Sequence, residues 1–172
     1  MRKYQKDGGL KVTIKVGDKM PEGKFAVMTG EGPGGVTTSE LFSGKKVVLF
    51  SVPGAFTPTC SAKHLPGFVD QAGAIKAKGV DTVACLSVND VFVMDAWGKS
   101  AGADGKVTML ADGNCDYSKA LGLELDASGF GMGMRSSRFA LVVDDGVVSH
   151  AFIEAAPTEL VASAAENVLS NL

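Results

Sequence analysis

The chain has 172 residues, of which 45% are hydrophobic and 21% charged, and its formal net charge is −2. These values are typical of one globular domain with a substantial core, so we expect residues 1–172 to form a single domain. The positive charges form no long run, which argues against an electrostatic nucleic-acid binder. No segment has the length of a membrane-spanning helix, and the N-terminus lacks the apolar stretch of a signal peptide. We therefore expect a cytoplasmic protein, with a trimmed organellar precursor as the alternative.

The first part of the chain predicts edge elements of a sheet. Residues 1–15 are polar and are expected to form an N-terminal arm or edge strand, and the alternation in Lys11–Val16 favours a short strand. Residues 25–28 and 36–41 are expected to pair as a hairpin across the glycine-rich turn at residues 30–35. A phosphate-binding loop is not expected in this turn, because no Gly-Lys-Ser/Thr closes it.

The strongest local pattern is a buried strand followed by a turn and a helix. The Val-rich run at residues 47–52 predicts the strand, and Pro53-Gly54 ends it. Thr57 or Thr59 is expected to cap the helix that follows, which Pro66 should kink near its first turns. Cys60 is thereby placed at or near the start of the helix. Unpaired N–H groups and the helix dipole favour a thiolate at that point.

The rest of the chain alternates strands and helices. Further strands are expected at residues 80–88, 106–111, 139–143 and 147–152, the last two joined as a hairpin by an Asp-Asp-Gly turn. Further helices are expected at residues 91–101 and 116–121 and from Pro157 onward. This order predicts an α/β protein with a central mixed β-sheet flanked by helices, and it suits a thioredoxin-like fold.

The cysteines and histidines limit the chemistry. The three cysteines are Cys60, Cys85 and Cys115, an odd number at wide spacings, which argues against a disulfide scaffold. No CxxC motif occurs, so a thioredoxin-type dithiol and a zinc ribbon are both excluded. Because His64 and His150 are the only histidines and lie far apart in the chain, we expect no metal and no other bound cofactor.

A thiolate at Cys60 needs more stabilisation than a helix terminus supplies. One terminus contributes at most ~1–2 kcal/mol, so a fixed cation is also expected, and the candidates are Lys63, His64, Arg135 and Arg138. Arg138 directly precedes an apolar strand, and its five-donor guanidinium can hold both a thiolate and an incoming oxygen. His64 follows Cys60 by four residues, and it is interpreted either as an ion-pair partner or as a polar residue hydrogen-bonded beside the site.

Several motifs together resemble the peroxiredoxin family. They are PGAFTPTCS at residues 53–61, HLPGF at residues 64–68, ACLSVND at residues 84–90, and Arg138-Phe139 before a strand–DDG–strand. Within the family the chain is similar to the type II, or peroxiredoxin-5, group of plants, bacteria and mitochondria. The resemblance implies a thioredoxin fold and a thiol-dependent peroxidase that reduces hydrogen peroxide and alkyl hydroperoxides to water and alcohols, with a part in cell redox homeostasis.

The same resemblance assigns roles to individual residues. Cys60 would be the peroxidatic nucleophile, which becomes a sulfenic acid. Thr57 would hydrogen-bond the thiolate and the peroxide, Arg138 would stabilise the thiolate and the leaving oxygen, and Pro53 would shield the pocket from water. The side chains expected around this substrate pocket are His64, Arg135 and Phe56.

The resemblance also bears on recycling and assembly. Animal members carry a resolving cysteine where Ala162 stands here, whereas plant-type members carry a second cysteine that matches Cys85. We expect an external thiol to recycle Cys60, either glutathione with glutaredoxin or thioredoxin, with an internal Cys60–Cys85 disulfide as the alternative. A homodimer is expected, and the candidate interface residues are Phe56, Phe92 and Trp97.

Two other functions stay open at this point. One is a peroxide-sensing redox interaction protein, in which oxidation of Cys60 changes a partner surface. The other is a Cys–His hydrolase that uses Cys60 and His64, although the sequence offers no clear acid to orient the histidine.

Overall fold

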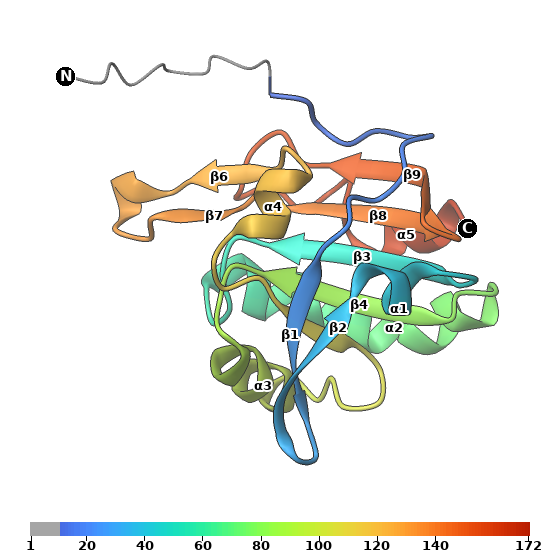
Figure 1. The fold of residues 1–172 in the computed structure, drawn as a ribbon, viewed down its shortest axis with the longest axis horizontal. Coiled ribbons are helices and arrows are strands. Elements are labelled where there is room, and N and C mark those ends of the chain that lie inside the picture. The colour runs from blue at the N-terminus through green and yellow to red at the C-terminus, as the bar shows by residue number, and fades with distance from the viewer. Residues whose placement is uncertain (1–10) are drawn as a thin grey trace.

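Residues 11–172, which the computed structural model describes, form a seven-stranded mixed sheet in the order β2-β1-β5-β4-β3-β8-β9 (Figure 1). The strands are β1 (Lys24–Thr29), β2 (Gly32–Thr37), β3 (Lys46–Val52), β4 (Thr82–Ser87), β5 (Thr108–Ala111), β8 (Phe139–Asp144) and β9 (Val147–Ile153). Strands β3, β4 and β5 run parallel, whereas β8 is antiparallel to β3. The predicted mixed sheet is therefore present.

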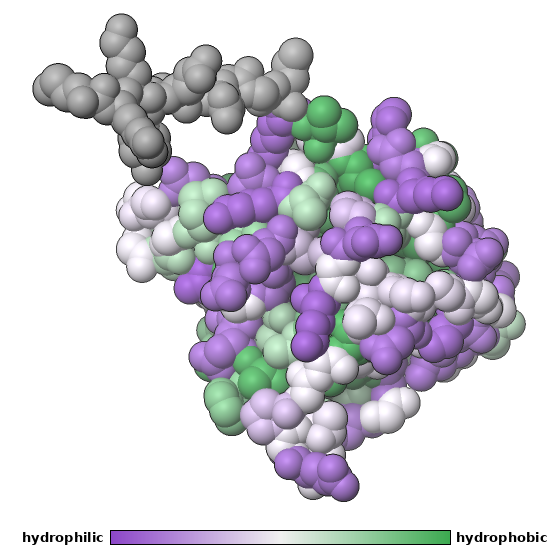
Figure 2. Space-filling view, viewed as in Figure 1, coloured by the Kyte–Doolittle hydropathy of each residue, from purple (hydrophilic) through white to green (hydrophobic). Residues whose placement is uncertain are grey.

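Helices cover both faces of this sheet. They are α1 (Thr38–Phe42), α2 (Leu65–Ala77), α3 (Val91–Ser100), α4 (Asp116–Ala120) and α5 (Ala165–Ser170), with a π-helical turn η1 (Cys60–His64) before α2. In Figure 1, α2, α3 and α5 lie behind the sheet, and α1 and α4 lie in front of it. The face in Figure 2 is largely hydrophilic, with apolar residues in smaller groups. None of the helices within residues 11–172 is long and apolar enough to cross a membrane.

Strand β3 is apolar throughout because both of its faces are covered. Val48, Phe50 and Val52 belong to the core beneath α2, α3 and α5. Val47 and Leu49 point to the opposite face and pack in the core beneath α1 and α4. Side chains alternate between faces along a strand, so a continuous hydrophobic run is the pattern of a strand buried between two layers.

The N-terminal hairpin forms, but its second strand lies earlier in the chain than predicted: β2 ends at Thr37, and residues 38–41 of the predicted strand belong to α1. Strand β2 begins at Gly32, so Pro33, Gly34 and Gly35 lie within the strand rather than in the turn. Phe25 pairs with Val36, and β2 is the edge of the sheet. An edge strand tolerates proline and glycine, because one side of its backbone has no neighbouring strand to bond.

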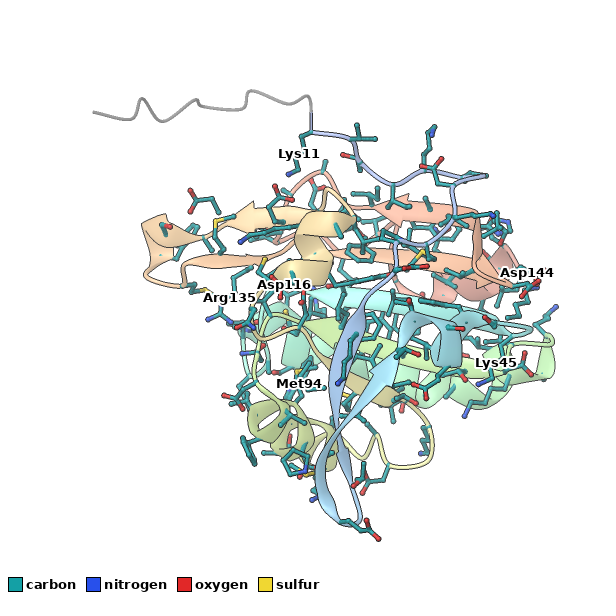
Figure 3. The ribbon with its side chains drawn as sticks, viewed as in Figure 1. Lys11, Lys45, Met94, Asp116, Arg135 and Asp144 are labelled. Carbon is teal, nitrogen blue, oxygen red and sulfur yellow. The ribbon has the colours of Figure 1, made fainter. Side chains whose placement is uncertain are left out.

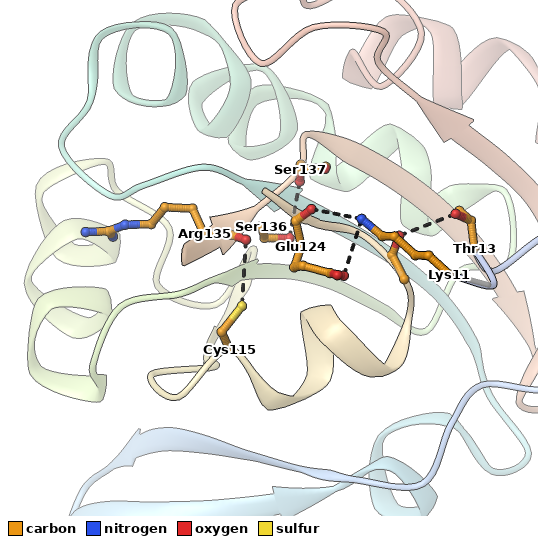
Figure 4. Close-up of polar contacts among 8 residues, drawn as sticks. Lys11, Thr13, Cys115, Glu124, Arg135, Ser136 and Ser137 are labelled. Atoms are coloured by element: carbon orange, nitrogen blue, oxygen red, sulfur yellow. Dashed lines mark hydrogen bonds and ion pairs between the residues drawn. The ribbon is translucent and has the colours of Figure 1, made fainter. Parts of the chain in front are cut away.

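The short strand predicted at residues 11–16 is wrong, and the part of the predicted arm before Lys11 lies outside the described residues. The segment is extended and bonds to the chain around Gly122. Ile14 N donates to Leu121 O at 2.9 Å, and Lys11 Nζ approaches Glu124 O at 3.3 Å (Figure 4). Its neighbour is thus a loop and the start of a short strand, which offer no continuous ladder.

Two further differences concern the segments around the candidate site. A small sheet of β6 (Glu124–Asp126) and β7 (Met134–Ser136) was not predicted, since three-residue strands are too short to show an alternating pattern. It projects from the edge of the fold where β3 and β4 end (Figure 1). The last helix begins at Ala165, not at Pro157, and residues 155–164 form a loop instead.

Gly122 allows the N-terminal segment to approach β6 closely. Its φ is +69°, and a Cβ atom there would lie 2.9 Å from Thr13 Cα and closer still to Val12 O. These are backbone atoms, which cannot move aside as a flexible side chain can. We therefore expect Gly122→Ala to lower the free energy of unfolding by about 1–3 kcal/mol, as measured by urea denaturation.

Gly129→Ala is the matched control, because a Cβ atom at Gly129 has nothing within 4 Å and the residue has no positive φ. Its effect should stay within about 0.5 kcal/mol. Equal destabilisation by the two substitutions would contradict the close approach at Gly122.

Candidate active site

The register of the sheet brings distant segments to one edge. Strand β3 pairs with β8 so that Ser51 lies opposite Phe139. Pro53, which follows β3, and Arg138, which precedes β8, therefore lie at the same end of the sheet. The chain after Pro53 leads into the helical turn that carries Cys60, 78 residues before Arg138.

The loop between β3 and the helix is held by backbone acceptors. Phe56 has a φ of +59° and an exposed side chain. The Thr57 hydroxyl donates to Gly54 O at 2.7 Å, and Ser61 N donates to Thr57 O at 2.9 Å. Neither Thr57 nor Thr59 caps the helix with its side chain, so that prediction is wrong. The Thr57 hydroxyl proton is instead used within the loop.

Cys60 begins a wide helical turn rather than a regular one. In η1 the Leu65 N–H bonds to Cys60 O, five residues back. Pro66 follows and has no N–H for the carbonyl four residues before it, so the bonding pattern changes here and α2 starts with proline in its first turn. The kink expected from Pro66 therefore takes the form of a π-turn. Trp97 Nε1 supports it by donating to Ser61 Oγ at 3.0 Å.

Arg138 is buried beside the sulfur of Cys60. Its Nη2 donates to Cys60 Sγ at 3.2 Å, its Nη1 bonds to His64 Nδ1 at 2.8 Å, and its Nε donates to Pro157 O at 3.1 Å. Arg138 is 2% exposed and Cys60 1%. Within residues 11–172 no carboxylate forms an ion pair with this guanidinium. A buried charge requires polar partners, and the Cys60 sulfur is one of the three groups that supply them.

His64 is a neutral acceptor for Arg138. Burial, and after it the charge of Arg138, lowers the pKa of His64 from 6.5 to about 3, while the contact with the Ser163 carbonyl opposes the shift. With Nδ1 accepting from Arg138, the proton lies on Nε2, which donates to Ser163 O at 3.1 Å. His64 thus bonds to Arg138 rather than forming an ion pair with Cys60. Both of its nitrogens are occupied, so the Cys–His hydrolase lacks a general base.

A cavity of about 340 Å³ opens over Cys60. Pro53, Thr57 and Arg138 lie on its inner side with the cysteine. The wall opposite comes from β6 and the turn after it and is mostly apolar; its residues are Leu125, Asp126, Ala127, Phe130 and Met132. Pro157 and Thr158 of the C-terminal loop complete the rim. The sulfur and the guanidinium therefore face a pocket large enough for a small organic molecule.

The other predicted pocket residues lie elsewhere. The Arg135 guanidinium bonds to Val88 O at 2.9 Å and to Met132 O at 2.8 Å, so it fixes the turn that carries Met132 instead of reaching Cys60. Its side chain lies at the end of the sheet where β3 and β4 end (Figure 3). Phe56 is not among the residues that line the cavity, and the Lys63 side chain is exposed.

Cys85 is a buried thiol within the sheet. It lies in β4 opposite Phe50 of β3 and is fully covered. Burial, and secondarily the neighbouring Cys60, raises the pKa of Cys85 well above its ordinary value, while Arg138 acts in the opposite direction. The thiol form, which is the weaker nucleophile, is therefore favoured. All three cysteines are free in this structure.

Cys115 contributes to the support of Arg135. It has a φ of +62° before α4, and its Sγ donates to Arg135 O at 3.7 Å (Figure 4). Burial, with a smaller effect of Asp112, raises the pKa of Cys115. The contact gives this thiol a structural role.

Sequence reasoning missed the part of the site that the C-terminal loop supplies. Pro157 O and Ser163 O are acceptors for Arg138 and His64, and Glu154 Oε1 accepts from both Ser163 N and Ser163 Oγ. Pro157 was instead expected to open a helix. Backbone carbonyls leave no trace in a residue pattern, and only a predicted loop at residues 155–164 could have pointed to them. Among residues 11–172 no group of three or more His, Cys, Asp or Glu side chains is arranged to hold a metal ion.

The mixed sheet and the buried cysteine–arginine pair define a thioredoxin-like α/β protein whose candidate site is built around a cysteine. A family model described as Redoxin matches residues 15–169. Peroxiredoxin-2C of Oryza sativa subsp. japonica is 51% identical over 160 residues, which cover 92% of this chain and 98% of that protein. The chain belongs to the redoxin family and, within it, to the peroxiredoxins. The family and the thioredoxin-like fold predicted from the sequence are thus confirmed.

Two further comparisons bear on function. The crystal structure of reduced Prx3 from Vibrio vulnificus in complex with H2O2 has 50% sequence identity and a TM-score of 0.88, and the match covers 92% of this chain and 99% of that chain. The chloroplastic peroxiredoxin-2E-2 of Oryza sativa subsp. japonica is 56% identical over 142 residues, or 79% of this chain. The match spans only 63% of the length of that relative.

The buried neutral state of His64 predicts a pH dependence of stability. The unfolded chain protonates His64 below about pH 6.5, whereas the folded chain does so only near pH 3, so the unfolded state binds more protons between these values. Stability therefore falls as the pH decreases through this window. Between pH 6.5 and pH 5 we expect wild type to lose about 1.5 kcal/mol more than His64→Gln, as measured by urea denaturation at both pH values.

His150→Gln serves as the control, because His150 lies in β9 and is not buried. This variant should follow the wild-type pH dependence. If His64→Gln followed it as well, the buried neutral histidine would be ruled out.

Proposed function

We propose that this protein is a thiol-dependent peroxidase that reduces hydrogen peroxide and alkyl hydroperoxides at Cys60. The observation that carries the proposal is the 3.2 Å contact between Arg138 Nη2 and Cys60 Sγ inside a cavity. Membership of the peroxiredoxins supports it, as does the similarity to a Prx3 crystallised with H2O2. The chemistry requires a thiolate and a fixed positive charge in one pocket, and these residues supply both.

The proposed reaction breaks the O–O bond of the substrate. The Cys60 thiolate attacks the terminal oxygen of ROOH, an S–O bond forms as the O–O bond breaks, and the leaving RO⁻ takes a proton to become ROH. The sulfur is oxidised to a sulfenic acid and the peroxide is reduced. Negative charge moves from the sulfur to the leaving oxygen during this step, so a cation that faces both atoms lowers the barrier.

Arg138 and Thr57 are proposed to hold the peroxide for this attack. Three of the five N–H groups of Arg138 are used by Cys60, His64 and Pro157, which leaves two to face the oxygens of a bound peroxide. The Thr57 hydroxyl donates to Gly54 O, so its oxygen is free to accept the O–H of the peroxide. Pro53 covers the inner side of the cavity with a residue that offers no N–H to water.

The sulfenic acid must then be reduced by thiols. One thiol forms a mixed disulfide with Cys60 and releases water, and a second thiol releases Cys60 as a thiol. We propose that glutathione with glutaredoxin, or thioredoxin, supplies them, because Cys85 is fully buried in β4 and its thiol form is favoured. A Cys60–Cys85 disulfide is the alternative, and it would require the turn around Cys60 to unfold.

Assembly and location also remain proposals. Trp97 is buried and is therefore excluded as a candidate interface residue, whereas Phe56 and Phe92 are 57% and 63% exposed. A homodimer that covers these two phenylalanines is proposed from the family resemblance. A cytoplasmic location also stays a proposal, and one relative is named as chloroplastic.

The cysteine roles are tested by single substitutions. Cys60→Ser should abolish hydroperoxide turnover, because serine provides no thiolate. Cys85→Ser should retain most glutathione-supported turnover, and Cys115→Ser is the matched control for losing a buried thiol. The measurement is the steady-state consumption of hydrogen peroxide over many equivalents. Wild type that consumes only one equivalent would favour the peroxide sensor. Folded Cys85→Ser without turnover would favour the internal disulfide.

The apolar wall predicts a preference that depends on Phe130. With Phe130→Ala, a bulky substrate such as cumene hydroperoxide loses an aromatic contact, so its kcat/KM should fall about fivefold to tenfold. The kcat/KM for hydrogen peroxide should stay within about twofold, since this substrate is too small to reach the wall. Val16→Ala, which shortens an exposed apolar side chain outside the cavity, is the control. Equal losses for both substrates would contradict an alkyl site at this wall.

A further inference from the structure

We propose that Glu154 is a positioning residue: its carboxylate latches the C-terminal loop, residues 155–164, against Arg138 and His64 and so directs the guanidinium at Cys60. The proposal rests on the peroxidase function proposed above. Glu154 contacts neither the sulfur nor the cavity, so it would act only through the groups that it holds.

One oxygen of Glu154 accepts three hydrogen bonds from the C-terminal part of this loop. Oε1 accepts hydrogen bonds from Val161 N at 2.7 Å, Ser163 N at 2.8 Å and Ser163 Oγ at 2.9 Å. Hydrogen bonds to an ionised acceptor are about twice as strong as those between neutral groups. The carboxylate therefore closes residues 155–163 into a ring whose ends are nine residues apart.

The loop starts next to Arg138, and two of its backbone carbonyls bond to Arg138 or to its partner His64. Glu154 follows β9, and its N–H donates to Arg138 O at 3.1 Å. From the loop, Pro157 O accepts from Arg138 Nε at 3.1 Å, and Ser163 O accepts from His64 Nε2 at 3.1 Å. His64 Nδ1 in turn accepts from Arg138 Nη1 at 2.8 Å. Three groups fix the guanidinium: Pro157 O, His64 and Cys60. The loop supplies the first and orients the second through Ser163 O, so two of the three depend on where the loop lies.

Apart from Glu154 and the contacts with Arg138 and His64, one further side-chain hydrogen bond holds the loop: Asn167 Nδ2 of α5 donates to Ala162 O at 2.7 Å. Ser163 is its one buried residue, and α5 begins only after it, at Ala165. The loop also has a cavity on each side. Pro157 and Thr158 border the 340 Å³ cavity over Cys60, while Leu160 and Ala164 border a second cavity of about 290 Å³ that His64 also lines. With open space on both sides, apolar packing does little to locate this segment, so its polar contacts must do so, and Glu154 accepts three of them.

The consequence concerns the orientation of the Arg138 guanidinium. Arginine loses its orientation readily, because several rotatable bonds separate the backbone from the guanidinium. Without the latch, Pro157 O and Ser163 O would no longer be fixed, and Arg138 would be held only by the thiolate and by a freed His64. Both the thiolate and the leaving oxygen would then lose part of their stabilisation.

The test compares Glu154→Ala, Glu154→Gln and Ser163→Ala with wild type. The first readout is the rate of Cys60 alkylation by iodoacetamide as a function of pH, followed by mass spectrometry of the Cys60 peptide. Arg138 bonds to the sulfur, the buried Cys85 thiol lies near it, and Asp126 lines the cavity over it. Because the guanidinium is the charged group in direct contact with the sulfur, the midpoint of this profile reports chiefly on Arg138. The second readout is the second-order rate constant with hydrogen peroxide.

Glu154→Ala should move the alkylation midpoint upward by about one pH unit and lower the rate constant with peroxide about tenfold or more. Glu154→Gln keeps a carbonyl oxygen that accepts the same three bonds without charge, so it should recover part of both losses. Ser163→Ala, which removes one of the three bonds, should give a smaller change in the same direction. A residue with a purely structural role would change stability but not the alkylation midpoint.

Glu159→Ala and Glu159→Gln are the matched controls. Glu159 lies in the same loop, is exposed, and can lose its charge without disturbing the latch. Wild-type midpoints and rate constants in the folded Glu154 variants would overturn the proposal, as would equal effects at Glu159. If Glu154→Ala does not fold, Glu154→Gln and Ser163→Ala decide. Alkylation needs no peroxide, so a wild type that fails to turn over peroxide would refute the proposed function while the alkylation profiles still test the latch.

Discussion

The contact on which the site depends is a buried positive charge beside a sulfur. The guanidinium of Arg138 is removed from water, and among residues 11–172 no carboxylate pairs with it. In such an environment a cation without partners is strongly unfavourable, so the groups that bond to the guanidinium, the Cys60 sulfur among them, are needed to hold it there. In the proposed reaction the same charge would face the oxygen that leaves when the peroxide bond breaks. One side chain would thus contact both the nucleophile and the leaving group.

The pairing of β3 with β8 fixes the position of this contact. Ser51 lies opposite Phe139, and the flanking residues of β3 and β8 are buried on both faces. A slip of one residue would exchange the faces of every side chain in β8, which the two packed cores do not allow. Hydrophobic patterning, which carries no chemistry itself, therefore fixes how Arg138 approaches the turn that holds Cys60.

Much of this arrangement could be predicted from local sequence. The apolar run before Pro53 gave the central strand, and the residues around Cys60 indicated a helix start after a central strand. Arg138 could be proposed because it directly precedes a second apolar strand. Local sequence patterns do not show which group each polar atom forms a hydrogen bond with. The π-turn depends on a missing N–H at Pro66, and the hydrogen bond of His64 goes to a backbone carbonyl 99 residues away.

The same limit explains the errors at the C-terminus. Pro157 and the apolar residues after it fit a helix, since propensity cannot register that Glu154 captures the N–H groups of Val161 and Ser163. In a helix these N–H groups would donate to backbone carbonyls four residues earlier. Here they donate to the Glu154 carboxylate instead. Strands β6 and β7 were missed because three residues are too few to show an alternating pattern.

Trp97, the only tryptophan of the chain, donates through its indole nitrogen to Ser61, the residue next to Cys60. Its ring is otherwise enclosed in the core beneath α3. Oxidation at the sulfur that loosens the π-turn would break this one polar link and alter the surroundings of the fluorophore. The fluorescence of Trp97 would then report on the turn that carries Cys60, so the proposed redox cycle could be followed in real time without any label.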